Sequence, residues 1–226
     1  LILTRDTSYI GTLIDDLVTK GTQEPYRIMT SRCEYRLLHR QDNADQRLTH
    51  IGAEIGLVPQ EQLKAVEEKY DRVRREIARL EGSGVAACEE LNAMLEAKGS
   101  APVAGSARLA DLIRRPQVSY EDIAPFDRQR PELSKAVTEE VEIQLKYAGY
   151  LARQEKQVAE FKREEARKIP EDMDYRAIAG LRLEAQEKLS TIRPVSVGQA
   201  GRISGVSPAD IGVLLIYLEQ KRGGSQ

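Results

Sequence analysis

The densest group of side chains that could do chemistry lies between Glu24 and Arg47, where five arginines fall within 24 residues. Three of them, Arg32, Arg36 and Arg40, recur every four residues. If this segment is helical, the spacing places one guanidinium per turn along one face. Guanidinium groups bind phosphate oxygens bidentately, so such a row could follow the backbone of a nucleic acid.

Two tyrosines in the same segment, Tyr26 and Tyr35, are available to stack on unpaired bases, and we include Arg27 among the candidate RNA contacts. An alternative is that the arginines are neutralised within the protein by neighbouring carboxylates. Four acids are present for five arginines: Glu24, Glu34, Asp42 and Asp45. Composition alone favours this second interpretation.

A second mixture of basic and aromatic residues consists of Lys146, Tyr147, Tyr150 and Arg153. These residues are candidates for a further RNA contact. Their periodicity also fits an ordinary helix whose tyrosines lie at the edge of the core.

The sequence offers no complete active site. Cys33 lies among the arginines, where positive charge can lower a thiol pKa, and Cys88 is expected on an apolar helix face. His39 and His50 are isolated and no cysteines stand at ligand spacing, so we expect no metal site. No nucleophile, base and orienting group occur together, and we assign no catalytic residue.

The stretch from Gly82 to Ala87 formally matches a relaxed dinucleotide-binding fingerprint. That motif requires a strand before it and a helix after it. Here the preceding residues have the pattern of a charged helix, so we do not assign a phosphate-binding loop or a bound cofactor.

Hydrophobic periodicity predicts a mainly α protein. We expect long amphipathic helices at 59–81 and 131–169, and shorter ones at 89–97 and 109–115. Alternation within 141–147 leaves a strand possible there, although the surrounding composition favours helix. The first 50 residues stay open between extended structure and a helix ending near Gly21, and no strand is expected after them.

Pro170 ends the second long helix, and the sequence after it has the pattern of short helices separated by Gly, Ser and Pro. We expect a helix through 178–189, a capping box at Ser196, and a last helix starting at Ser207. The predicted organisation is a junction segment at 1–57, a helical domain at 58–170 and a small helical subdomain at 171–226.

Composition excludes several classes of protein. The 226 residues carry 34 Lys and Arg against 36 Asp and Glu, so no global field attracts nucleic acid or membranes. Apolar runs are too short for a membrane helix, and two cysteines fit a reducing cytoplasm. A first residue other than Met suggests a piece of a longer protein.

Several strings closely resemble the C-terminal part of the glucose-inhibited division protein A (MnmG) family. They are GTLIDDL at 11–17, EPYRIMTSRCEYRLLHRQDNADQRLT at 24–49, VEIQLKYAGYLARQ at 141–154, MDYRAIAGL at 173–181 and RPVSVGQAGRISGVSPADI at 193–211. The resemblance runs along essentially the whole chain in the same order.

The resemblance implies a tRNA-modifying enzyme that uses FAD and NADH and forms 5-carboxymethylaminomethyluridine at the wobble position together with a partner GTPase, MnmE. The flavin-binding part of such enzymes would precede Leu1, on which the junction segment would pack, so we expect no cofactor in this chain and a homodimer when full-length. By resemblance, the helical region contacts tRNA and docks the GTPase. Its tRNA candidates are Arg27, Arg32, Arg36, Arg40, Lys146, Tyr147 and Arg153, and its partner candidates are Arg202, Ile211 and Leu215. A purely structural or protein-interaction role without direct RNA contact is the alternative.

Overall fold

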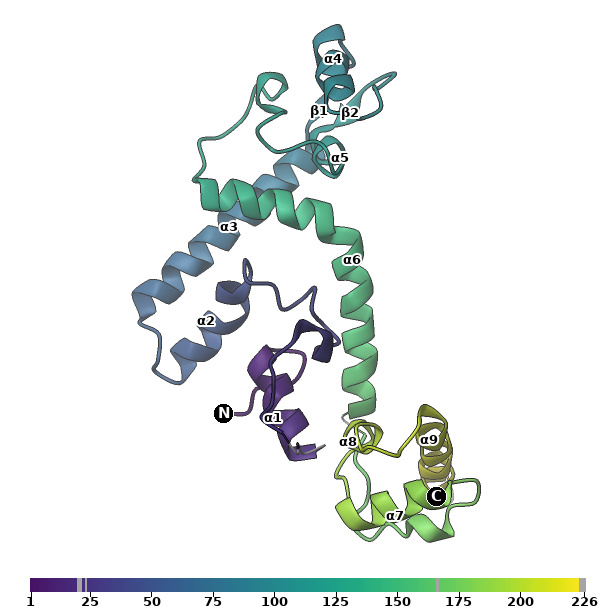
Figure 1. Cartoon of the computed structure of the whole chain (residues 1–226). Coiled ribbons are helices and arrows are strands. Elements are labelled where there is room, and N and C mark those ends of the chain that lie inside the picture. The colour runs from purple at the N-terminus through teal and green to yellow at the C-terminus, as the bar shows by residue number, and fades with distance from the viewer. Residues whose placement is uncertain (20–21, 23, 166, 224–226) are drawn as a thin grey trace. The chain divides into compact units, whose positions relative to one another are not determined.

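The computed structural model describes residues 1–19, 22, 24–165 and 167–223. Contacts divide the chain into two compact units. Residue 1 and residues 39–152 form the first unit, and residues 2–38 and 153–226 form the second. Figure 1 labels the elements along the chain.

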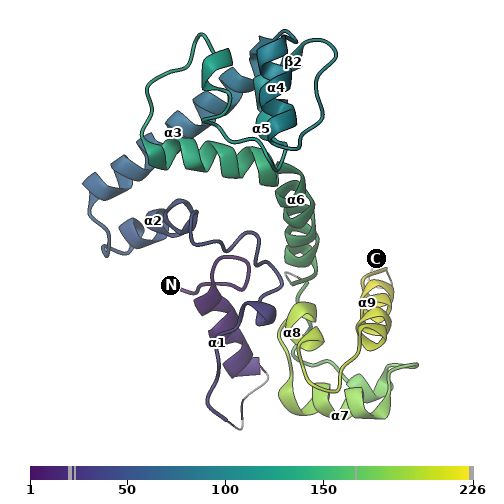
Figure 2. The ribbon, with the colours of Figure 1, turned by 45° about the horizontal axis from the view of Figure 1, so that its top comes forward.

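The first unit begins with an antiparallel pair of helices, α2 (Ala44–Glu54) and α3 (Gln60–Gly82). The connection is short and turns at Gly56, whose φ of 77° lies in the left-handed region that favours glycine. Figures 1 and 2 show α2 beneath the first half of α3. A connection this short forces the two helices to lie side by side.

The second half of α3 carries a small subdomain formed by β1 (Gly84–Val85), α4 (Glu89–Ala97), β2 (Ala107–Arg108) and α5 (Leu109–Ile113). The two strands are antiparallel, with Gly84 opposite Arg108 and Val85 opposite Ala107. Next comes the 3-10 turn η2 (Ala124–Phe126), and then the first part of α6 (Lys135–Glu165) packs across α3 (Figure 2).

Apolar side chains from all these elements share one core. Fully buried members include Val73, Leu80, Leu91, Leu112 and Val141. Burying one such side chain stabilises the fold by about 1.5–3 kcal/mol. The three- and four-residue spacing along α3 and α6 places these side chains on one face of each helix, so they can all be buried in the same core. Beside this core, Arg79 joins two buried carboxylates, those of Glu76 at 2.7 Å and Asp127 at 2.5 Å.

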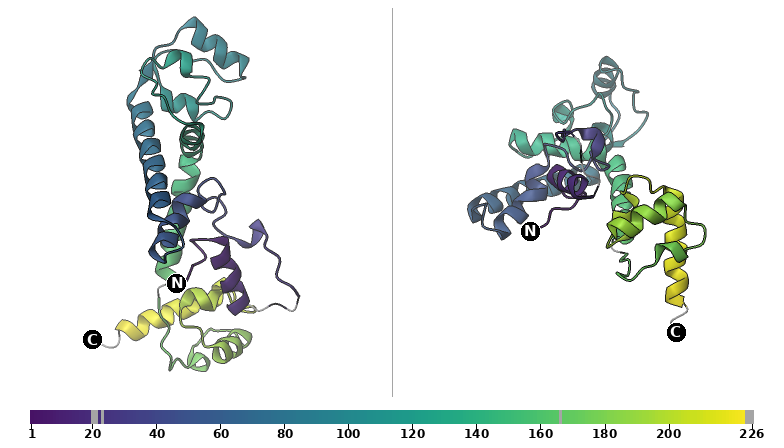
Figure 3. Two further views of the ribbon diagram at one scale, coloured as in Figure 1. Left: turned by 90° about the vertical axis from the view of Figure 1, so that its left-hand side faces the viewer. Right: turned by 60° about the horizontal axis from the view of Figure 1, so that its bottom comes forward.

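The second unit contains α1 (Tyr9–Thr19), the 3-10 turn η1 (Thr30–Arg32), the end of α6 and a terminal helical subdomain. That subdomain comprises η3 (Tyr175–Ala177), α7 (Leu183–Ile192), α8 (Val197–Gly201) and α9 (Pro208–Gly223). Figure 3 shows α9, in yellow, beside the green helices of the same subdomain. Their core includes Met173, Ile178, Leu189 and Leu214.

The helix caps follow the predicted side-chain chemistry. The hydroxyl of Ser196 accepts from the amide of Gln199 at 3.2 Å. At α9, the Asp210 carboxylate accepts from the amide of Ser207 at 2.8 Å, and the Ser207 hydroxyl accepts in return from the amide of Asp210 at 3.3 Å. Each satisfied cap contributes about 1 kcal/mol by pairing backbone groups that the helix leaves open.

The mainly α fold class and the two long helices are confirmed, including helix rather than strand at 141–147. Helix α2 lies partly within the segment that the sequence left open. Two expectations on local structure are wrong: the two short strands lie after residue 50, and α7 begins at Leu183 rather than near Ile178. Ile178 and Leu181 are core residues that precede the helix, so hydrophobic spacing alone extended it too far.

Helix α1 fits the open alternative of a helix closing near residue 21, although Lys20 and Gly21 lie outside the described residues. Gly11 in this helix is buried, and a Cβ there would collide with the carbonyl oxygen of Thr4. Only glycine permits this approach of the first residues to α1.

Candidate nucleic-acid interface

The arginine-rich segment is not an α-helix. After η1, residues 34–38 form turns, and burial alternates: Cys33 and Tyr35 are each 5% exposed, whereas Glu34 and Arg36 are exposed. Burying residues two positions apart requires extended or turn-like backbone rather than a 3.6-residue period. A row of one guanidinium per helical turn at Arg32, Arg36 and Arg40 required a helix here, and this condition is not met.

A buried arginine holds this segment in place. The guanidinium of Arg5 is 3% exposed and donates to Asp16 at 2.7 Å, Asp15 at 3.0 Å and Glu34 at 2.7 Å. It also donates to the backbone carbonyl of Arg32 at 3.3 Å. Burial lowers the pKa of Arg5, but its hydrogen bonds to Glu34 and Asp16 outweigh this effect, so the net shift is upward and the charge is permanent.

A glutamine gives this segment a second support. The side-chain oxygen of Gln154 accepts from the amide of Leu38 at 3.1 Å, and its amide nitrogen donates to the carbonyl of Glu34 at 3.3 Å. Sequence reasoning missed both Arg5 and Gln154. No local pattern marks them, because their partners lie 29 and 116 residues away along the chain.

Arg32 lies over the ring of Tyr26, with 4.4 Å between the guanidinium carbon and the ring centroid. The Tyr26 hydroxyl donates to Asp16 at 2.7 Å, and burial together with this carboxylate raises the pKa of Tyr26. The ring is thus oriented from its hydroxyl end while its face meets a cation. Arg32 and Tyr26 form a stacked pair within the second unit.

Three of the predicted RNA contacts are exposed cations. Arg27, Arg36 and Arg153 are exposed, and within the described residues none of them makes an ion pair or a side-chain hydrogen bond. All three belong to the second unit. No carboxylate among the described residues pairs with these three charges.

The predicted contacts of the first unit are more strongly paired. Arg40 donates to both carboxylate oxygens of Asp42, with 2.9 Å in the shortest contact, and its guanidinium carbon lies 5.6 Å from the ring centroid of Tyr147. Lys146 donates to Glu142 at 2.7 Å, one helical turn away. These pairs agree with the interpretation that nearby carboxylates satisfy part of the basic residues.

Two tyrosines on α6 nevertheless present aromatic surface. Tyr147 is 39% exposed and Tyr150 is 62% exposed, and their ring centroids are 6.4 Å apart at a tilt of 56°. Aromatic surface exposed beside a guanidinium is the arrangement on which unpaired bases stack.

The predicted partner contacts all belong to the second unit and are partly buried there. Arg202 donates from Nη2 to Asp15 at 3.0 Å, and its side chain is 12% exposed. Ile211 and Leu215 are half-buried against the terminal core. The apolar side chains that this subdomain leaves exposed are instead Leu183, Ile192, Val195 and Ile216.

The remaining reactive side chains do not assemble. Cys33 is buried, and Cys88 is exposed at the N-cap of α4, so the expectation of an apolar helix face for Cys88 is wrong. In the described part of the chain, no three His, Cys, Asp or Glu side chains are grouped to hold a metal ion. None of the described helices has both the length and the hydropathy to cross a membrane.

The glycine-containing stretch from Gly82 to Ala87 begins at the last residue of α3 and continues into the two-residue strand β1. A dinucleotide-binding turn instead joins a parallel strand to a helix whose N-terminus faces the pyrophosphate. The residues present here do not fit a flavin or nicotinamide site.

Comparison with known proteins gives matches along the whole chain. The family model of the tRNA modifying enzyme MnmG/GidA C-terminal helical domain matches residues 60–155, and that of the MnmG/GidA C-terminal helical bundle matches residues 157–226. The tRNA uridine 5-carboxymethylaminomethyl modification enzyme MnmG of Caldicellulosiruptor saccharolyticus is 54% identical over 226 residues, which are 100% of this chain and 36% of that protein. The enzyme of the same name from Lachnoclostridium phytofermentans is 54% identical over 98% of this chain and 35% of its own length.

Among solved structures, Aquifex aeolicus GidA in its form II crystal superimposes with a TM-score of 0.76 at 42% identity, covering 96% of this chain and 34% of the other. The chain thus spans about a third of the length of the relatives that it matches.

Proposed function

The chain belongs to the MnmG/GidA family, in the region of its C-terminal helical domains, and from this premise we propose that it binds tRNA and docks a partner GTPase. The enzyme that it would serve is an FAD-dependent, NADH-using enzyme that forms 5-carboxymethylaminomethyluridine at the wobble position. We expect that enzyme to be a cytoplasmic homodimer and its partner to be the tRNA modification GTPase MnmE.

The observation that supports tRNA binding is a set of exposed cations, Arg27, Arg36 and Arg153, with which no described carboxylate pairs. Each can form bidentate bonds to a phosphate without first giving up an ion pair. Arg40 and Lys146 would have to exchange Asp42 and Glu142 for a phosphate, so we assign them a weaker part. Phosphate contacts position an RNA and read little of its sequence.

The exposed rings of Tyr147 and Tyr150 extend this proposal to the single-stranded part of the RNA. Bases in an anticodon loop are easily unstacked, and a target uridine must leave its stack before any enzyme can modify carbon 5. Tyrosine faces can hold the neighbouring bases during this step.

The flavin supplies the redox chemistry when it is bound. Because the described residues of this chain do not fit a flavin site, the flavin would be held by another part of the enzyme. The contribution of this chain would be to orient the anticodon arm and to hold the partner. In the second role, exposed Leu183, Val195 and Ile216 are better candidates than half-buried Ile211 and Leu215.

A purely structural role is the second candidate function. It is favoured by the pairing of Arg40, Lys146 and Arg202 with carboxylates inside the chain. In that case the helices would support the rest of the enzyme and RNA would be held elsewhere.

A salt titration separates the two candidates. Labelled anticodon stem-loop is titrated with the 226-residue chain at about 50 and 200 mM salt, the range over which phosphate contacts respond strongly. Arg36→Gln should flatten the slope of log affinity against log salt by about 0.7–0.9, the value for one lost phosphate contact. Arg40→Gln, the matched control with an internal partner, should change the slope by less than half as much. Salt-independent or absent binding would leave the structural role.

Partner docking is tested with the GTPase itself. Ile216→Asp, on the exposed part of α9, should weaken GTPase binding at least tenfold and leave stem-loop binding unchanged. Leu57→Asp is the matched control, because Leu57 is an exposed apolar residue of the first unit. Equal loss in both variants would contradict a docking surface on the terminal subdomain.

A further inference from the structure

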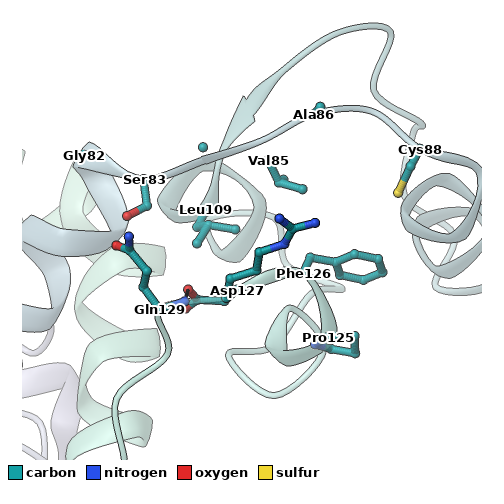
Figure 4. A pocket seen from close by; sticks show the side chains of 12 residues that line it. Gly82, Ser83, Val85, Ala86, Cys88, Leu109, Pro125, Phe126, Asp127 and Gln129 are labelled. Atoms are coloured by element: carbon teal, nitrogen blue, oxygen red, sulfur yellow. Dashed lines mark hydrogen bonds between the residues drawn. The ribbon is translucent and has the colours of Figure 1, made fainter.

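An open cleft of about 690 Å³ in the first unit has no part in the RNA contacts proposed above. The segment from Gly82 to Cys88 forms one wall, and the segment from Pro125 to Gln129 forms the other (Figure 4). Leu109 lies between the two walls.

One wall of the cleft is the free edge of a strand. In the β1–β2 ladder, the amide of Leu109 donates to the carbonyl of Ser83 at 3.0 Å, and the amide of Ala87 donates to the carbonyl of Gly105 at 2.9 Å. Backbone groups alternate in direction along an antiparallel strand. The amides and carbonyls of Gly84 and Ala86 therefore point away from β2, on exposed residues that line the cleft.

The opposite wall offers one cation and an apolar surface. Arg128 is exposed, and within the described residues it has no ion pair or side-chain hydrogen bond. The carboxylate beside it, on Asp127, is already held by Arg79 at 2.5 and 2.9 Å and does not neutralise it. Phe126 and Pro125 add apolar area next to this charge.

We propose that this cleft binds an extended acidic peptide segment, which adds to the free edge of β1 and pairs a carboxylate with Arg128. The alternating donors and acceptors of Gly84 and Ala86 match a peptide backbone, which carries both N–H and C=O groups. A nucleic-acid backbone carries charged phosphate acceptors and, in RNA, hydroxyl donors, but not the regular alternation of N–H and C=O groups that pairs with a strand edge. The single cation selects an acidic side chain, and the apolar wall accommodates its neighbours.

The test uses the 226-residue chain labelled with nitrogen-15 and an acetylated hexapeptide in which valine alternates with glutamate. Binding should be saturable, should shift the amide signals of Gly84 and Ala86, and should slow their hydrogen exchange. Arg128→Glu should weaken the peptide at least tenfold. Arg72→Glu, which makes the same charge change at an exposed arginine of α3, should leave the affinity within twofold.

Four results would overturn the proposal. The first is absence of saturable binding by the hexapeptide, and the second is equal affinity for a version with methylated backbone nitrogens, which cannot pair as a strand. The third is an unchanged affinity in Arg128→Glu. The fourth is a shift of the same amides by oligouridylate or by raising the protein concentration alone, which would assign the cleft to RNA or to a second copy of the chain.

Discussion

Replacing Arg5 by methionine should open α1 and the loop that carries Arg36. The Arg5 guanidinium is 3% exposed and reaches α1 through Asp16 at 2.7 Å and the loop through Glu34 at 2.7 Å. Methionine keeps the apolar stem and removes the charge, so the change isolates the ion pairs from the packing.

The magnitude follows from the burial of the partners. Removing one member of a buried ion pair costs about 3–5 kcal/mol because the remaining charge stays in the protein without compensation. The Asp16 side chain is 5% exposed and keeps the hydroxyl of Tyr26, whereas the Glu34 side chain is 48% exposed and is readily solvated. The lower end of the range therefore applies, and about 3 kcal/mol corresponds to a more than hundredfold rise in local opening.

Hydrogen exchange followed by mass spectrometry measures this opening directly. The amides of α1 should exchange roughly a hundredfold faster in Arg5→Met, while the amides of α3 and α4 in the first unit keep their parent rates. Arg36→Met is the matched control, since it removes an exposed arginine from the same unit. Exchange of α1 in Arg5→Met within threefold of the parent rate would refute the role given to this side chain.

Three further predictions concern single side chains. Hydrogen bonds from Arg182 and from the capping serine hold the pKa of Asp210 well below its ordinary 3.8, so its stabilisation is present above that value and is lost as pH falls. Asp210→Asn should therefore lower the Tm of the terminal subdomain at neutral pH and flatten its decline below about pH 4, and an unchanged decline would contradict this. In urea unfolding, Gly11→Ala should destabilise the chain by about 1–3 kcal/mol, because the added Cβ collides with backbone. Gly149→Ala lies in open space on α6 and should stabilise the chain by about 0.5–1 kcal/mol. Effects of the same sign in the two variants would refute the steric argument. Tyr150→Ala should weaken single-stranded RNA by about 1–3 kcal/mol while Tyr150→Phe keeps the affinity, and anisotropy titrations that show no difference would exclude stacking.

The long helices could be predicted because their formation depends on nearby residues. Apolar side chains recur at three- and four-residue steps through α3 and α6, and a single helix face must bury them together. The caps at Ser196 and Ser207 are equally local, since their bonds span three residues. The family resemblance was visible for the same reason, in contiguous strings of sequence.

The candidate interface was predicted only in part. The sequence identified the arginine-rich segment and the tyrosines of α6, but it could not separate the exposed Arg36 from the paired Arg40. Both have acidic neighbours in the sequence, and the choice depends on the backbone path. The backbone of this segment is held by residues distant in the chain, since Arg5 pairs with Glu34 across 29 positions and Gln154 bonds the amide of Leu38 across 116.

The sequence by itself therefore determined the helical class, the long helices, the caps at Ser196 and Ser207 and the family, because each rests on short-range pattern or on matching strings. Only the tertiary structure decided which cations are neutralised and which edge of β1 stays open. Arg5 meets Glu34 across 29 positions, and Arg202 meets Asp15 across 187. Ion pairs of this span arise when the whole unit folds, and no local periodicity encodes them.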